Sequence, residues 1–353
     1  MYATSVETVQ DGFLETINQV MHNGSDVKVR GATTREIQTM VMNIKSPEKS
    51  IICYPHRNNN IFATVAETLW VLAGRNDIAF LSKYLPRAKD FSDDGLVWRA
   101  GYGQRLRNYK SEVDQLHETV RLLREDDSSR RAVMSIFDPT SDFEQSKDIP
   151  CTNWIHTMIR GFCIHTTVSV RSNDAMWGAS GINWFEWSTL MKLYAAVLDK
   201  GIGEMNYLAD SYHIYDYHFD RVLQMLERNA DGFDDIYRLE YSPTLITTKT
   251  LPKFDSLLSM IMYNIMQDTF DWKVIEEIDD KFLRNCSHML CAHRYGYDAV
   301  TVAHHINAMD FDSDLRIAAI ECLSRKENWQ EIMPKLNFSK IDKLFLSQFK
   351  ISV

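Results

Sequence analysis

The hydrophobic residues of this 353-residue chain recur with two different periods, and the period changes once along the chain. In the first part, stretches of alternating apolar and polar residues, typical of strands, separate stretches with helical spacing. From Lys253 onward the spacing is helical almost throughout, as at Leu257 and Ile261. The chain is therefore expected to form an α/β (α+β) region over residues 1–248 and an all-helical region over residues 249–353.

The composition is that of a soluble globular protein, since 45% of the residues are hydrophobic and 25% are charged. The formal net charge of −9 argues against nucleic acid as a substrate, because phosphate backbones are bound by basic surfaces. The N-terminus has no signal-peptide pattern, no apolar run is long enough to span a membrane, and the six cysteines follow no disulfide framework. We therefore expect a cytoplasmic enzyme with reduced thiols, in the host cytoplasm if the gene is phage-encoded.

Local patterns predict the main elements. Residues 154–171 have the alternation of a β-hairpin that turns at Arg160 and Gly161, so that Arg171 ends its second strand. Residues 182–199 are expected to form the central helix of the core. The other expected elements of the first region are helices over 5–22, 64–72 and 113–123, strands over 37–44 and 132–137, a polar loop over 86–94 and a tight turn at 101–103. In the second region, helices are expected from 253 onward and over 273–291, 296–308, 314–324 and 328–349.

Cys151 follows a proline and has arginines on both sides of it in the sequence, Arg130 and Arg131 upstream and Arg171 downstream. Positive charge favours the thiolate, which is the nucleophilic form of cysteine. Guanidinium groups also bind phosphate through paired hydrogen bonds. These residues therefore predict covalent chemistry on a phosphorylated small molecule.

Glu67 is a carboxylate among apolar neighbours in the helix predicted over residues 64–72. Two interpretations stay open. It is either a charge at the edge of the helix or a buried functional acid, since burial raises a carboxyl pKa toward values useful in proton transfer.

Several motifs follow one another along the first 220 residues. They are Val29-Arg30-Gly31, Glu67 to Gly74, Tyr102-Gly103, Ser129-Arg130-Arg131, Pro150-Cys151, Arg171-Ser172-Asn173-Asp174, Gly178, Asn183 and His213-Ile214-Tyr215. In kind and order they resemble the thymidylate synthase superfamily, which includes the phage and bacterial pyrimidine-nucleotide hydroxymethylases. The resemblance covers residues 5–220 and rests on the whole series of motifs.

The resemblance implies a large mixed sheet with a central helix, and a homodimer in which Arg130 and Arg131 reach into the partner's site. It also implies transfer of a one-carbon unit from 5,10-methylenetetrahydrofolate to C5 of a pyrimidine nucleoside monophosphate. The Cys151 thiolate would first add to C6 of the ring, which makes C5 nucleophilic.

The resemblance assigns a role to each matching residue. Glu67 would move protons through ordered water, Tyr102 would assist removal of the C5 proton, and Asp174 would act in catalysis and bind the pterin. The remaining assignments are phosphate binding by Arg30, Arg130, Arg131, Arg171 and Ser172, ribose binding by His213 and Tyr215, base binding by Asn183, and folate contact by Gly178 and Lys89. His213 and Tyr215 also suit buried hydrogen-bonding positions without a ligand.

Three departures from a thymidylate synthase bear on the reaction. Thr152-Asn153 follows the cysteine, as in phage deoxycytidylate hydroxymethylase, where the synthases have histidine. A tryptophan pair near the folate is replaced at Lys89 and Ser92, and the closing C-terminal tail is replaced by the helical region. A synthase excludes water so that hydride reduces the exocyclic methylene group, whereas a hydroxymethylase lets water attack it. The departures therefore favour 5-hydroxymethylation, which would suit a phage that modifies its DNA.

Asn183 is the nearest residue to the place of the base-binding asparagine, although it comes one residue later than the spacing from Arg171 predicts. An amide can donate to O4 of uracil and accept from N3–H, so dUMP is favoured over a cytosine nucleotide. The alternatives are reductive methylation of dUMP to dTMP, hydroxymethylation of dCMP or CMP, and a nucleotide-binding scaffold without activity. The presence of Cys151, Glu67 and Tyr102 together argues against a scaffold.

A second set of chemically versatile residues, Cys286, His288, Cys291 and His293, has the residue types of a zinc site. In a continuous helix over residues 282–293, however, these side chains would spread over more than one face. They are expected to be packing residues, and no metal is expected.

Overall fold

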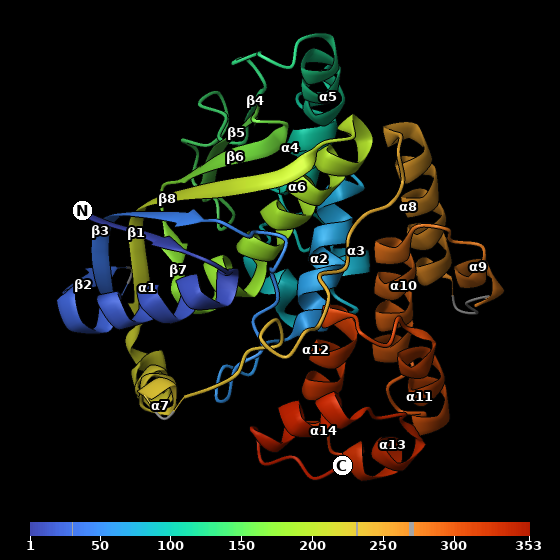
Figure 1. The fold of residues 1–353 in the computed structure, drawn as a ribbon. Helices are drawn as coiled ribbons and strands as arrows, with labels where there is room; N and C mark the ends of the chain where they lie inside the picture. The colour runs from blue at the N-terminus through green and yellow to red at the C-terminus, as the bar shows by residue number, and fades with distance from the viewer. Residues whose placement is uncertain (30, 231, 268–271) are drawn as a thin grey trace.

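The computed structural model describes residues 1–29, 31–230, 232–267 and 272–353. An eight-stranded mixed sheet has the order β1-β3-β8-β6-β5-β4, with β2 beside β3 and β7 beside β8 (Figure 1). Its strands are β1 (Tyr2–Val6), β2 (Ser25–Val29), β3 (Ala32–Ile44), β4 (Val133–Ser135), β5 (Thr152–Arg160), β6 (Cys163–Val170), β7 (Asn173–Asp174) and β8 (Gly201–Tyr215). The expected mixed α/β fold is confirmed.

The helix predicted over residues 182–199 is the centre of the core. It is α6 (Trp184–Leu198), and every residue from Trp184 to Val197 is buried. The π-helix η2 (Ala175–Asn183) runs directly into it. The other helices of the first region are α1 (Val9–Asn23), α2 (Ile61–Leu72), α3 (Ile78–Leu81), η1 (Pro86–Phe91), α4 (Tyr102–Arg107), α5 (Gln115–Glu125), η3 (Asp216–His218) and α7 (Phe219–Ala230).

The second region is helical, as predicted, and lies beside α2 (orange to red in Figure 1). Its elements are α8 (Leu251–Met266), α9 (Lys273–Glu276), α10 (Lys281–Arg294), α11 (Ala299–Ala308), α12 (Asp314–Leu323), α13 (Trp329–Ile332), η4 (Met333–Lys335) and α14 (Lys340–Ser347). Both α10 and α12 pack against α2. The buried apolar residues of the two regions belong to one continuous cluster. Helix α2 is therefore covered by the helical region on one side.

The predicted hairpin is confirmed and ends where the site begins. Strands β5 and β6 pair from Thr152 with Val170 to Arg160 with Cys163. Gly161 and Phe162 form the turn with φ of +56° and +69°, the left-handed backbone of a tight hairpin. The chain leaves β6 at Arg171, next to the backbone of Cys151.

Some expectations about local structure were wrong. The helix predicted from residue 5 begins at Val9, because Thr8 and Asp11 form a capping box and Tyr2–Val6 pairs in parallel with β3. The turn expected at residues 101–103 is the start of α4. At Gly103 a Cβ atom would lie 2.6 Å from the carbonyl oxygen of Arg75, so the glycine permits close contact with the end of α2.

The single helix expected over residues 328–349 is divided into α13, η4 and α14. A further error is the single helix expected over residues 273–291. Its first turn is α9, and a new helix, α10, starts after Asp280, whose carboxylate accepts a hydrogen bond from the backbone N–H of Leu283. A capping carboxylate of this kind ends one helix and starts another.

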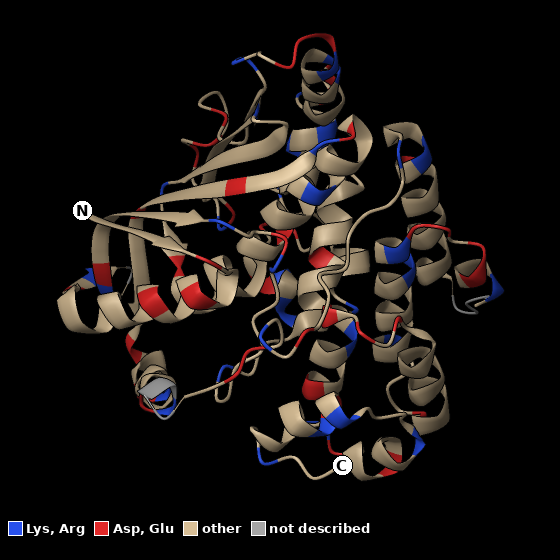
Figure 2. Cartoon of the chain, in the orientation of Figure 1, with Lys and Arg blue, Asp and Glu red and all other residues tan. Residues whose placement is uncertain are grey.

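Acidic and basic side chains are interspersed over the described elements rather than gathered into a basic stripe (Figure 2). Across the described ranges, no helix is long and apolar enough to cross a membrane.

Candidate active site

A cavity of about 660 Å³ lies where the ends of several strands meet helices α2, α4 and η2. Its size is within the range of pockets that bind small molecules. Eight of the residues singled out from the sequence line it: Glu67, Tyr102, Cys151, Arg171, Ser172, Asp174, Gly178 and Asn183. His213 and Tyr215, on β8, line it as well. Among the described residues, its lining comes only from the first 217 positions, so the helical region does not form part of its wall.

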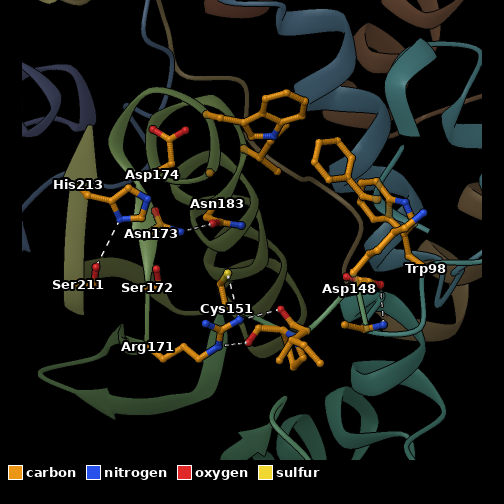
Figure 3. A pocket seen from close by; sticks show the side chains of 18 of the residues that line it. Trp98, Asp148, Cys151, Arg171, Ser172, Asn173, Asp174, Asn183, Ser211 and His213 are labelled. Carbon is orange, nitrogen blue, oxygen red and sulfur yellow. Dashed lines mark hydrogen bonds between the residues drawn. The ribbon is translucent and has the colours of Figure 1, made fainter. Parts of the chain in front are cut away.

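The Cys151 thiol lies beside the guanidinium of Arg171 (Figure 3). Nη2 of Arg171 is 3.9 Å from Sγ. The same guanidinium donates to the carbonyl oxygens of Pro150 at 2.9 Å and Ile149 at 3.0 Å, so it is fixed against the loop that carries the thiol. A cation held at this place favours the thiolate.

Glu67 projects from α2, and burial raises its pKa to about 8, with a further contribution from the negative charge of Asp148. Its Oε2 atom is buried and has no hydrogen-bond partner in the described part of the chain. Of the two interpretations of Glu67 in the sequence, this geometry fits the buried acid. A carboxyl with such a pKa can both give and take a proton near neutral pH.

A second buried carboxyl, Glu186 on α6, is only 1% exposed. Burial raises its pKa well above the ordinary value, and the charge of Glu67 raises it further. Its Oε2 accepts a hydrogen bond from Nδ2 of Asn183 at 3.2 Å, whereas its Oε1 has no partner among the described residues. Two neighbouring carboxyls, Glu67 in the cavity lining and Glu186 outside it, thus both have raised pKa values.

The Asn183 amide is held from two sides. Its Oδ1 accepts from Nδ2 of Asn173 at 3.0 Å (Figure 3). Its Nδ2 donates to Glu186. Gly178 packs against this pair, since a Cβ atom there would lie 3.0 Å from Nδ2 of Asn173 and 3.6 Å from Oδ1 of Asn183. A side chain at position 178 would therefore press on both amides.

The one-residue offset of Asn183 coincides with the π-helix η2. A π-helix holds more residues per turn than an α-helix, so it can absorb one additional residue without moving its ends. Arg57 is buried and braces η2, because its Nη2 donates to the carbonyl of Met176 at 2.7 Å and to Oγ of Ser180 at 2.9 Å. Asn183 consequently reaches the cavity despite its unexpected spacing.

His213 belongs to a relay of three side chains on β3 and β8. The Ser211 hydroxyl donates its only proton to the carboxylate of Glu36. Ser211 Oγ is also 3.4 Å from Nδ1 of His213 (Figure 3), and must accept there, so Nδ1 carries the proton. Nε2 of His213 is then the acceptor that remains for a ligand.

Tyr102 stacks on Trp187, with ring centroids 5.7 Å apart. Its hydroxyl oxygen accepts a hydrogen bond from the backbone N–H of Thr152 at 3.1 Å. Burial raises the pKa of Tyr102 well above its ordinary value, so the phenol is neutral at physiological pH. The hydroxyl is thereby fixed one residue from Cys151.

The expectation that Lys89 and Ser92 stand near the folate in place of a tryptophan pair was wrong for this cavity. Lys89 is exposed and outside the cavity lining, and Ser92 is buried in its own turn with Oγ donating to the carbonyl of Val97 at 2.6 Å. The wall is aromatic instead, formed by Phe91, Trp98 and Trp177. Phe91 contacts Trp177 edge to face with centroids 5.4 Å apart. Lys89 is therefore not placed to contact a ligand in this cavity.

The remaining predicted arginines lie elsewhere. Arg130 and Arg131 are exposed and do not line the cavity of their own chain. Arg30 lies outside the described residues, although its neighbour Val29 lines the cavity.

The sequence interpretation did not single out Glu36, Ser211, Glu186 or Trp98. Ser211 is two positions before His213, so its place on the same face follows once β8 is recognised as a strand. Glu186 is three positions after Asn183, which is the spacing of neighbours on one helix face. Trp98 follows the polar loop and gave no periodic signal.

The cysteines and histidines of α10 are packing residues. Cys286 and Cys291 are buried, the His293 ring contacts Phe62 at 5.3 Å, and His288 Nδ1 is 3.1 Å from Nδ1 of His305. Over the described ranges, no three His, Cys, Asp or Glu side chains are grouped to hold a metal ion.

Comparison with known proteins identifies the family. The family model described as Thymidylate synthase matches residues 11–255. The deoxyuridylate hydroxymethyltransferase of Bacillus phage SP01 is 32% identical over 226 residues, which are 61% of this chain and 59% of that protein. A protein of the same description from Pseudomonas phage M6 is 31% identical over 189 residues, 52% of this chain and 53% of that protein.

A putative thymidylate synthase of Methanothermobacter thermautotrophicus is 30% identical over 228 residues, 64% of this chain and 99% of that protein. The chain thus spans less than two thirds of the length of the two phage relatives but nearly all of the archaeal one. The family match ends near the change from mixed to helical structure. Because that match extends over more than half of the chain, the chain belongs to the thymidylate synthase family.

Proposed function

We propose that this enzyme transfers a one-carbon unit to C5 of dUMP and releases 5-hydroxymethyl-dUMP. The observation that carries the proposal is the Cys151 thiol beside Arg171, in one cavity with Glu67 and the Asn183 amide. The similarity to two phage proteins described as deoxyuridylate hydroxymethyltransferases supports the same reaction.

In the proposed reaction the Cys151 thiolate attacks C6 of the pyrimidine, the C5–C6 double bond breaks, and C5 becomes an enolate-like nucleophile. Arg171 keeps the sulfur ionised. Glu67 exchanges protons with the ring and with water, for which a pKa of about 8 is suitable. Tyr102, whose hydroxyl is fixed by the N–H of Thr152, assists removal of the C5 proton. After the final step Cys151 leaves C6 and the ring double bond re-forms.

The nucleotide is proposed to lie with its 5′-phosphate at Arg171 and Ser172, joined by Arg30. Its ribose 3′-hydroxyl donates to Nε2 of His213, the nitrogen that the Ser211 relay leaves as an acceptor, with Tyr215 beside it. Arg130 and Arg131 are exposed on their own chain, so we propose a homodimer in which each protomer donates them to the other's phosphate site.

The residues of the cavity fit 5,10-methylenetetrahydrofolate, which supplies the one-carbon unit when bound. The aromatic wall of Phe91, Trp98 and Trp177 offers flat apolar surfaces for a pterin and its attached ring. Asp174 lies in the same cavity, and its Oδ1 accepts the backbone N–H of Met176 at 2.8 Å, which leaves Oδ2 for the pterin. Gly178 adjoins these groups without adding bulk. Lys89 is left out of this proposal.

The choice of product rests on Thr152 and on the helical region. Thr152 takes the place of a histidine, and no described residue beyond position 217 covers the cavity, so water is able to reach C5. The aromatic wall favours a second candidate, reductive methylation to dTMP, because it would shield the reacting carbon. The archaeal relative described as a putative thymidylate synthase supports that candidate.

We also propose that the two regions of the chain have different roles. Residues 1–248 form the catalytic region, and residues 249–353 support α2 from behind rather than closing the site. This accounts for the packing of α10 and α12 on α2.

Incubation of the purified protein with dUMP and 5,10-methylenetetrahydrofolate tests the proposal. Mass spectrometry of the nucleotide should show the hydroxymethyl product, with tetrahydrofolate released. A methyl product with dihydrofolate would establish the second candidate instead. Turnover of dCMP or CMP alone would contradict the assignment of the base.

A further inference from the structure

The Asn183 amide has one hydrogen-bonding contact on each of its two ends. Oδ1 accepts from Asn173, and Nδ2 donates to Glu186, at 3.0 and 3.2 Å. An amide has two N–H groups and two carbonyl lone pairs, so one donor and one acceptor remain available. Asn183 lines the cavity, and this remaining pair is what a base would meet there.

The two orientations of that amide suit different bases. With N–H toward position 4 and oxygen toward position 3, the amide complements the O4 and N3–H groups of uracil. Turned by 180°, it presents oxygen to the exocyclic amine and N–H to N3, which is the complement of cytosine. Whatever fixes the orientation of the amide therefore fixes the base.

Asn173 alone does not determine this orientation. Its Oδ1 is buried without a partner in the described part of the chain. If both amides turned together, that Oδ1 would accept from Nδ2 of Asn183 and the Asn173–Asn183 hydrogen bond would be retained. The contact that distinguishes the two arrangements is the one between Asn183 and Glu186.

We propose that Glu186 is a positioning residue that gives the enzyme its preference for uracil, because its Oε2 holds the Asn183 amide in the uracil-reading orientation. The inference rests on the proposed function and extends it to a residue for which the sequence motifs had no role. Glu186 acts through Asn183 and does not itself contact the nucleotide.

Oε2 of Glu186 accepts from Nδ2 of Asn183, whereas Oε1 has no partner in the described part of the chain. An amide turned by 180° would place Oδ1 against this acceptor oxygen and lose the hydrogen bond. Gly178 leaves room beside both amides, since a Cβ atom there would lie 3.0 Å from Nδ2 of Asn173.

The test compares Glu186→Gln with Glu321→Gln, which changes another buried carboxyl on α12, outside the cavity lining. A glutamine at 186 can turn either its oxygen or its amine toward Asn183, so both orientations become accessible. We expect the ratio of kcat/KM for dUMP to that for dCMP to fall at least about tenfold, as for loss of one buried hydrogen-bond match. Glu321→Gln should leave the ratio unchanged.

A second variant, Asn173→Asp, changes the other hydrogen-bond partner of the Asn183 amide. It still tests the inference if Glu186→Gln folds poorly. The carboxylate of Asn173→Asp cannot donate, so Nδ2 of Asn183 should turn toward it and preference should move toward dCMP. Equilibrium binding of dUMP and dCMP, measured in a Cys151→Ser background, gives the same ratio without turnover.

Equal losses for both nucleotides in Glu186→Gln, with a ratio within about twofold of the wild type, would refute the inference. The wild-type enzyme serves as the test of the proposed function itself. If it used dCMP exclusively, both the proposed base and the role of Glu186 would be wrong. If it bound dUMP in preference to dCMP without turning it over, the proposed function would fail, while the binding ratios in the Cys151→Ser background would still decide the role of Glu186.

Discussion

Two buried acidic sites in this molecule are constructed in opposite ways. In the helical region, Asp342 accepts hydrogen bonds from Arg316 at 3.1 Å, from the backbone N–H of Ser339 at 2.8 Å and from the hydroxyl of Tyr241 at 2.5 Å. At the cavity, Glu67 and the neighbouring Glu186, which lies outside the lining, have no ion pair to a cation in the described part of the chain, and the charge of Glu67 raises the pKa of Glu186.

The different surroundings of the two acidic sites suggest different roles, one in stability and the other in proton transfer. A buried carboxylate surrounded by donors and a guanidinium is part of the scaffold, because removing one partner leaves the other unpaired. Buried acids without such partners reduce stability, and they are retained where a proton must be held and released. If this contrast holds, substitutions at the cavity should change turnover, and substitutions at Asp342 should change stability.

Cys151→Ser should reduce turnover by about 10,000-fold or more, because a serine hydroxyl is far less nucleophilic than a thiolate. Nucleotide binding and the free energy of unfolding should change little, since Cys151 is only half-buried. Steady-state kinetics, equilibrium binding of dUMP and urea unfolding measure the three quantities. Residual turnover within tenfold of the wild type would remove Cys151 from the reaction.

Asp342→Ala should have the opposite profile. It leaves Arg316, which is fully buried, without its carboxylate and should cost about 3–5 kcal/mol of stability. The kcat per folded molecule should stay unchanged. Chemical unfolding gives the stability loss, and Lys343→Ala, an exposed neighbour, should stay within about 0.5 kcal/mol of the wild type.

A loss of kcat in folded Asp342→Ala protein would show that the two acidic sites are not separable. Replacing the pair by Arg316→Met with Asp342→Leu should recover part of the lost stability, because it removes the unpaired charge.

Glu67→Gln should change how stability depends on pH. The folded protein binds the Glu67 proton more tightly than the unfolded chain does, with a pKa of about 8 against an ordinary 4.5. Stability supplied by that proton is therefore present at low pH and is lost as pH rises from about 4.5 to about 8. Between pH 5.5 and 8.5 the wild type should lose about 3 kcal/mol that the variant keeps.

Urea unfolding of both proteins at these two pH values checks the prediction. Parallel pH profiles would mean that Glu67 is not a buried acid in the folded protein. The control is Glu118→Gln, an exposed carboxylate, which should follow the wild type.

Ser211→Ala should have the smallest effect. Without the Ser211 acceptor, the Nδ1–H of His213 loses its partner, and Nε2 is no longer held as an acceptor for the ribose. We expect KM for dUMP to rise about fivefold, equivalent to about 1 kcal/mol, with kcat nearly constant. The 3′-deoxy analogue of dUMP should bind wild type and variant equally. A weaker affinity for the analogue as well would show that Ser211 acts through structure alone.

The sequence predicted the parts of the fold that depend on local pattern. The hairpin at residues 154–171 and the apolar helix after Asn183 follow from alternation and helical spacing. Strand β8 was missed although Asn206 and Asp210 alternate with the buried Met205, Tyr207 and Ala209. Its role in the sheet is set by two neighbouring strands. Long-range pairing of this kind has no signal within one segment.

Site residues that belong to motifs could be predicted from the sequence, whereas site residues placed only by packing could not. Cys151, Arg171 and His213 came from motifs and meet in one cavity. The sequence pattern placed the residue near the folate at Lys89. The structure instead places Trp98 at the cavity, after a turn whose course cannot be predicted from sequence spacing. Glu186 lies next to Asn183 through ordinary helical spacing, but none of the motifs gave it a role.

Helix α2 is a wall shared between two compartments. Glu67 faces the cavity, while Phe62 contacts His293 of the helical region on the other side. Close-packed interiors transmit displacement rather than absorb it. A small molecule or partner that shifted α10 would therefore displace the helix that carries Glu67 without entering the cavity.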